Sequence, residues 1–163
     1  VRILDTAEPT GCLLFTEHSL IVGANKYFEI DLNTFEAEEF LDLSDKKLCQ
    51  VMMCYEAGSF PIGIIKISDK PIEYLLCFNE IAVFVDEYGR HSRKAELKWN
   101  RLPQAFHYHA PYLHVVQFAS VEIIKITPDT CNRLQNSVDS LLNTDCFTLP
   151  FSSVQHLGRE RRG

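Results

Sequence analysis

The amino-acid sequence predicts an all-β protein built from β-propeller blades. Three observations support this prediction: apolar runs are short and separated by turns, a strand–turn–strand pattern recurs, and its two later copies lie about 40 residues apart. A propeller blade is a small four-stranded antiparallel sheet with a repeat of this length. At that period, 163 residues correspond to about four blades, which we expect to be part of a larger propeller. The first copy lies 55 residues before the second, which an insertion around residues 44–59 would explain.

The expected strands are rich in Val, Ile, Leu, Tyr and Phe, the residues that favour pleated, half-buried segments. In order, they cover residues 11–16, 19–23, 26–31, 61–67, 74–78, 81–86, 96–99, 105–109, 112–116, 121–126 and 146–149. Short connections at residues 24–25, 79–80 and 118–120 are typical of hairpins.

The repeat is clearest in residues 19–30, 74–85 and 112–126, each of which reads as a strand, a tight turn and another strand. A strand that begins with proline precedes the two later copies, and these prolines, Pro61 and Pro103, are 42 residues apart. One blade cannot bury both faces of its sheet alone, so each needs a neighbour. A β-sandwich is the competing architecture, because regular short strands also suit it.

Two segments are less regular. Residues 34–43 are acidic and fit either a short helix or a strand followed by a loop. Residues 130–142 carry Leu134, Val138, Leu141 and Leu142 at helical spacing, which predicts a helix.

The composition is that of an ordinary soluble protein, with 46% hydrophobic and 23% charged residues. This balance excludes a disordered tail, and no apolar run approaches the ~20 residues of a membrane-spanning helix. The N-terminal residues do not resemble a signal peptide, and without an initiator Met we expect a longer parent protein. Six cysteines lie mostly in apolar runs and no N-glycosylation sequon occurs, which favours a reducing, cytoplasmic environment.

Charge is distributed unevenly along the chain. Residues 1–87 carry 16 acidic and 6 basic side chains, whereas residues 88–163 carry 6 acidic and 10 basic ones. A group that we call the basic strip consists of Arg90, Arg93, Lys94, Lys98 and Arg101. We expect the basic strip on an exposed loop and strand edge, facing an acidic protein or a lipid headgroup, although an ordinary solvated face has the same composition. The acidic chain as a whole argues against nucleic-acid binding.

Catalytic and metal-binding signals are weak. His107 and His109 would share one strand face, and with His114 and Cys77 they would be the best zinc candidates, but an exposed histidine face explains them more simply. The sequence has no Gly-x-Ser-x-Gly elbow, phosphate-binding loop or kinase signature. We therefore expect no enzyme activity, cofactor or metal in this chain. We also expect a left-handed turn at Gly89 and a core position for Trp99.

Residues 73–90, with 97–106 and 111–113 downstream, resemble the signature of the citron homology (CNH) domain family, and the resemblance extends over about residues 5–126. Residues 28–31 and 39–42 favour a citron-type member. The resemblance implies a partial CNH propeller over residues 1–158 with a basic tail at 159–163, forming a non-catalytic C-terminal module of a larger protein.

The resemblance implies that this module binds a Rho-type small GTPase or a cytoskeletal or midbody protein in cytokinesis. It also implies a location at the cleavage furrow or midbody, and a contact with the remainder of the same propeller. The alternative interpretation is a phosphoinositide-binding module at a membrane surface.

Overall fold

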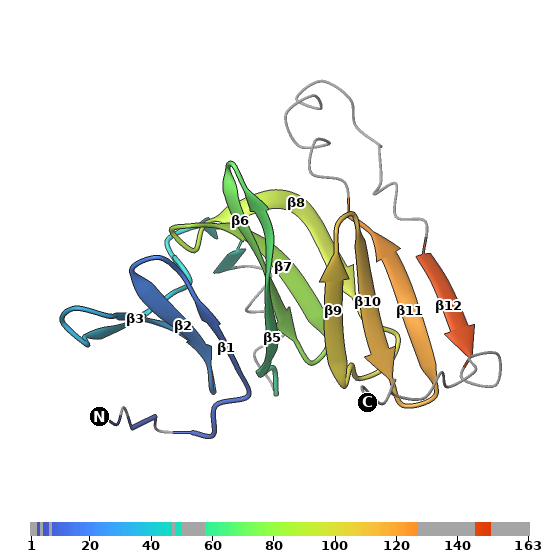
Figure 1. Ribbon diagram of the computed structural model, residues 1–163, viewed down its shortest axis with the longest axis horizontal. Helices are drawn as coiled ribbons and strands as arrows, with labels where there is room; N and C mark the ends of the chain where they lie inside the picture. The colour runs from blue at the N-terminus through green and yellow to red at the C-terminus, as the bar shows by residue number, and fades with distance from the viewer. Residues whose placement is uncertain are drawn as a thin grey trace, which may run out of the picture.

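The computed structural model describes residues 3, 5–6, 8–46, 48–49, 58–126 and 146–150. Their strands form three four-stranded antiparallel sheets (Figure 1). The first contains β1 (Cys12–Phe15), β2 (Ser19–Gly23), β3 (Tyr27–Asp31) and β4 (Ala37–Glu39). The second contains β5 (Pro61–Asp69), β6 (Ile72–Phe78), β7 (Ile81–Asp86) and β8 (His91–Lys98). The third contains β9 (Ala105–His109), β10 (Tyr112–Gln117), β11 (Ser120–Lys125) and β12 (Cys146–Pro150).

Each sheet is a meander in which consecutive strands pair through short turns. The bounds of β2, β7 and β9 are those expected from the sequence, and the other predicted strands differ from the structure mainly at their ends. In the acidic segment 34–43, the strand-and-loop alternative is confirmed, because β4 pairs with β3. The helix predicted for residues 130–142 and the boundary expected at residue 158 lie outside the described residues.

The three sheets are stacked in chain order, with their first strands β1, β5 and β9 side by side (Figure 1). One hydrophobic core lies between the first and second sheets, and another lies between the second and third. The middle sheet is therefore covered on both faces. A sandwich of two facing sheets has no such layer, whereas adjacent propeller blades pack in this way. The all-β, blade-like architecture is confirmed, with three blades in the part of the chain that the structure describes.

The most apolar part of the sequence forms the centre of this stack. All residues of β7 except Asp86 are buried, as are all residues of β6 except Ile72. A strand that is covered on both faces needs a continuous apolar sequence rather than an alternating one. In the outer third sheet, β10 and β11 instead alternate between buried and partly exposed residues.

Candidate protein-interaction site

The basic strip begins at the turn between β7 and β8. The Asp86 carboxylate accepts hydrogen bonds from the backbone N–H groups of Tyr88 and Arg90, both at 2.9 Å. Gly89 has φ of 70°, as expected for a left-handed turn. Its carbonyl oxygen accepts a hydrogen bond from the backbone N–H of Asp42 at 3.1 Å. This turn of the second blade therefore docks on the segment that follows β4 of the first.

Arg90 is exposed but carries its own counter-ion. Its Nε donates to the Asp42 carboxylate at 3.1 Å, and its guanidinium lies 5.7 Å from the ring centre of the exposed Tyr88. Hydrogen bonds from Ser44, and then from Arg90, hold the pKa of Asp42 below its usual value. Asp42 compensates the charge of Arg90, so this residue adds little to a basic surface.

The expectation that Arg93 lies on an exposed loop is wrong. β8 begins at His91, and only 8% of the Arg93 side chain is exposed. Its Nε donates to Glu73 Oε1 at 2.8 Å and its Nη2 donates to Oε2 of the same carboxylate. The guanidinium also lies 4.4 Å from the ring centre of Phe84. Arg93 therefore belongs to the interior of the second blade.

Arg93 is buried because it pairs with a neighbouring carboxylate. Glu73 lies in the apolar strand β6, and its side chain is only 10% exposed. A buried carboxylate is costly unless it is paired and hydrogen-bonded. Arg93 supplies the charge, and the Ser92 hydroxyl donates a further hydrogen bond at 2.6 Å. An acidic residue inside an apolar strand was the sequence signal for this pairing.

The remaining members of the basic strip lie at or beyond the far end of β8. Lys98 and Arg101, which we call the outer basic pair, are both exposed. Arg101 forms no hydrogen bond or ion pair within the described part of the chain. Lys94 is in β8, but the structure does not describe its side chain. Among the basic-strip side chains that the structure describes, the outer basic pair lies exposed away from the Asp42 contact.

Trp99 occupies a core position, as the sequence predicts. The indole is buried between the second and third blades beside Leu97 and at 5.5 Å from the ring of Phe106. Its Nε1 donates to the carbonyl oxygen of Phe78 at 2.9 Å. The buried polar atom is thus satisfied, and the side chain fixes the start of the third blade rather than forming a contact surface.

The histidines do not combine with Cys77. His107 and His109 are exposed on β9, and His114 of β10 lies opposite His107 in register. Phe106, on the other face of β9, packs into the core that contains Cys77. β9 therefore separates the cysteine from the histidines. Among the described residues, no cluster of three or more His, Cys, Asp or Glu side chains could hold a metal ion.

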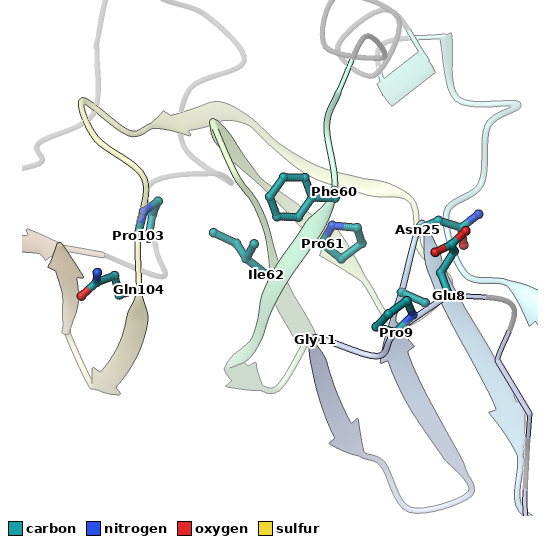
Figure 2. A pocket seen from close by; sticks show the side chains of 10 residues that line it. Glu8, Pro9, Gly11, Asn25, Phe60, Pro61, Ile62, Pro103 and Gln104 are labelled. Carbon is teal, nitrogen blue, oxygen red and sulfur yellow. The ribbon is translucent and has the colours of Figure 1, made fainter. Parts of the chain in front are cut away.

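A pocket of about 490 Å³ lies where the three blades begin (Figure 2). Its walls come from the segment before and at the start of β1, from the β2–β3 turn, from the start of β5 and from the segment before β9. The lining residues are Glu8, Pro9, Gly11, Ala24, Asn25, Phe60, Pro61, Ile62, Pro103 and Gln104. In the sequence, Pro61 and Pro103 mark the repeat, and nothing there pointed to this pocket directly. The shared position of these two prolines at the start of a blade was the sequence feature that could have indicated the pocket.

Comparison with known proteins identifies this architecture. A family model described as "CNH domain" matches residues 1–138. The chain belongs to the CNH domain family. Citron Rho-interacting kinase of Homo sapiens is 46% identical over 125 residues, which cover 76% of this chain and 6% of that protein. The expected resemblance to a citron-type member is confirmed.

Two further relatives support the assignment. Serine/threonine-protein kinase MRCK alpha of Homo sapiens is 38% identical over 99 residues, which cover 61% of this chain and 5% of that protein. The solved AfRom2 CNH domain superposes with a TM-score of 0.63 at 26% identity, covering 73% of this chain and 38% of that one. The CNH domain is a β-propeller and a non-catalytic interaction domain, which is consistent with a chain that is not an enzyme.

The chain spans only a small fraction of the two kinases that it matches. In the part that the structure describes, no helix is both long and apolar enough to cross a bilayer.

Proposed function

We propose that this CNH domain is a protein-interaction module that binds a Rho-type small GTPase or a cytoskeletal partner in cytokinesis. The observation that carries the proposal is the 46% identity to a protein named Citron Rho-interacting kinase, over 76% of this chain. A stack of small sheets with a rigid core suits recognition through its surface, because little conformational order is lost on binding.

The outer basic pair is the proposed contact for an acidic surface of that partner. Lys98 and Arg101 are exposed, whereas Arg93 is buried. Complementary charge mainly raises the rate and specificity of association. The whole protein would be a longer cytoplasmic kinase or scaffold that this module directs to the cleavage furrow or midbody.

The test is capture of a Rho-type GTPase, loaded with a non-hydrolysable GTP analogue, on immobilised chain. We expect the double variant Lys98→Glu/Arg101→Glu to retain clearly less GTPase than the wild type. The matched control is Lys46→Glu/Lys70→Glu, which reverses two exposed charges elsewhere on the chain and should behave as wild type. Equal retention by all three proteins would remove the outer basic pair from the proposal.

A membrane surface is the alternative outcome of the same series. Each basic residue near an anionic bilayer contributes about 1 kcal/mol of binding. The membrane alternative predicts that the wild-type chain sediments with vesicles containing phosphoinositide and does not capture the GTPase. It also predicts that Lys98→Glu/Arg101→Glu no longer sediments with these vesicles.

We also propose that further blades of the same propeller cover the first sheet. Leu13 and Phe15 of β1 are 55% and 65% exposed, and the AfRom2 CNH domain chain is longer than this one. In a Leu13→Cys variant, a maleimide should label this thiol readily in the 163-residue chain and slowly in the full-length protein. Equally fast labelling in both would contradict the proposal.

A further inference from the structure

We propose that the pocket at the starts of β1, β5 and β9 binds an extended peptide segment of a protein partner. The segment would carry an aromatic or aliphatic side chain and, toward β1, a lysine or arginine. This inference rests on the proposed function as an interaction module, and it names the chemistry of a second contact that the outer basic pair does not provide.

The middle of the pocket is apolar. Phe60, Pro61 and Ile62 form its central wall, between the β1 side and the β9 side (Figure 2). The Phe60 side chain is 46% exposed although it is a large hydrophobic residue. A volume of about 490 Å³ lies within the range of sites that enclose organic ligands. An apolar side chain seated here would cover the Phe60 ring and lose its own contact with water.

Amide side chains flank this apolar wall. Asn25 lies toward β1 and Gln104 lies toward β9, on opposite sides of Phe60, Pro61 and Ile62 (Figure 2). Both residues are exposed, and neither amide forms a hydrogen bond within the described part of the chain. An amide offers donors and an acceptor together, which match the N–H and C=O groups of a peptide backbone. This arrangement favours an extended peptide over a compact ligand.

The charge of the pocket specifies one end of the peptide. Glu8 is the single ionisable residue among those that line the pocket in the described structure, and its carboxylate has no ion-pair partner there. It lies beside Asn25 on the β1 side (Figure 2).

The walls are already held in place by backbone hydrogen bonds. The backbone N–H of Phe60 donates a hydrogen bond to the side-chain oxygen of Asn79 at 2.9 Å. On the two flanks, the backbone N–H of Gly11 donates to Gly23 and that of Gln104 donates to Val116, both at 2.8 Å. A preformed pocket binds without paying for loop ordering, which favours recognition of a short segment.

The test uses fluorescein-labelled octapeptide pools and fluorescence anisotropy with the full 163-residue chain. One pool has a fixed Phe and an Arg two positions away; the second has Glu in place of Arg, and the third has Ala in place of Phe. We expect the wild type to bind the Arg pool at least about threefold more tightly than the Glu pool. Binding to the Ala pool should be about tenfold weaker than to the Arg pool.

Charge reversal provides the decisive variant. Glu8→Lys should prefer the Glu pool, and Phe60→Ala should weaken binding of the Arg pool by about tenfold. The matched control is Glu17→Lys, whose side chain is 93% exposed between β1 and β2 and does not line the pocket. It should behave as wild type, and circular dichroism should show that each variant is folded.

The proposal is overturned if no pool binds the wild type, if the Arg and Glu pools bind equally, or if Glu8→Lys retains the preference for Arg. Its failure is distinct from failure of the proposed function. Loss of GTPase capture with intact peptide binding contradicts only the partner class, whereas absent peptide binding with intact GTPase capture contradicts only the pocket.

Discussion

The hydroxyl oxygen of Tyr27 lies 2.6 Å from the carbonyl oxygen of Gly63, although the two residues belong to different blades. The same hydroxyl lies 2.7 Å from the carbonyl oxygen of Cys77, the register partner of Gly63. The pairing of β5 with β6 shifts between Pro61 and Gly63 at this point. Tyr27 is fully buried, so its hydroxyl supplies a donor that water cannot provide.

Tyr27→Phe should therefore destabilise the domain without altering its shape. Removing the hydroxyl leaves buried carbonyl oxygens without that donor, which costs about 1–3 kcal/mol of unfolding free energy. Urea denaturation measures this change. Tyr112→Phe is the control, because that side chain is 42% exposed. Equal stability of the two variants would show that the hydroxyl does not join the blades.

Alkaline pH should destabilise the protein. Burial raises the pKa of Tyr27 and of Cys77 well above their usual values of 10.0 and 9.0. The folded state therefore keeps these protons at a pH where the unfolded chain releases them. Stability is fully present below the unfolded pKa values and falls as pH rises from about 9 toward the folded ones.

The measurement is the free energy of unfolding as a function of pH. In the double variant Tyr27→Phe/Cys77→Ala, we expect a smaller loss of stability above about pH 9 than in the wild type, because two of the responsible groups are gone. Parallel curves for the two proteins would contradict this assignment.

Gly89→Ala should be strongly destabilising. A Cβ atom at Gly89 would lie 1.8 Å from the Phe40 carbonyl oxygen, and φ is also positive. The turn would have to move away from the first blade, releasing Asp42. Gly58→Ala is a matched control, since Gly58 has φ of 104° but no neighbouring atom within 4 Å of the added Cβ.

Gly58→Ala should lower the free energy of unfolding by about 1 kcal/mol, from backbone strain alone. Gly89→Ala should lose at least about 2 kcal/mol more, because the clash adds to the strain. Thermal unfolding of both variants measures the difference, and similar melting temperatures would argue against tight docking of the turn.

Arg93→Met should destabilise the second blade by about 3–5 kcal/mol, because it leaves the Glu73 carboxylate buried without its counter-charge. The double variant Arg93→Met/Glu73→Met should recover most of this loss. Chemical denaturation of Arg93→Met, Glu73→Met and the double variant gives the coupling energy between the two side chains. A double variant that is no more stable than Arg93→Met would refute the role of charge pairing.

Local sequence signals identified most of the strands. In β6 and β7, a continuous apolar run indicates burial on both faces. In β10 and β11, by contrast, the buried positions include the polar residues Gln117 and Glu122, which the sequence pattern did not indicate. The left-handed turn at Gly89 and the core position of Trp99 followed from the same kind of information. Such features depend on neighbours along the chain, so sequence reasoning can reach them.

The interaction surface depended on residues that meet only after folding. Arg93 reads as part of a basic cluster until Glu73, on another strand, is placed beside it. The pocket is lined by Glu8, Phe60 and Gln104, which lie just before the first strands of three different blades. The positions of most strands were thus determined by the sequence alone, because period and turn chemistry are local. Which charges remain exposed, and where a pocket opens, was decided by the stacking of the blades, because only that stacking determines which distant side chains neutralise or enclose one another.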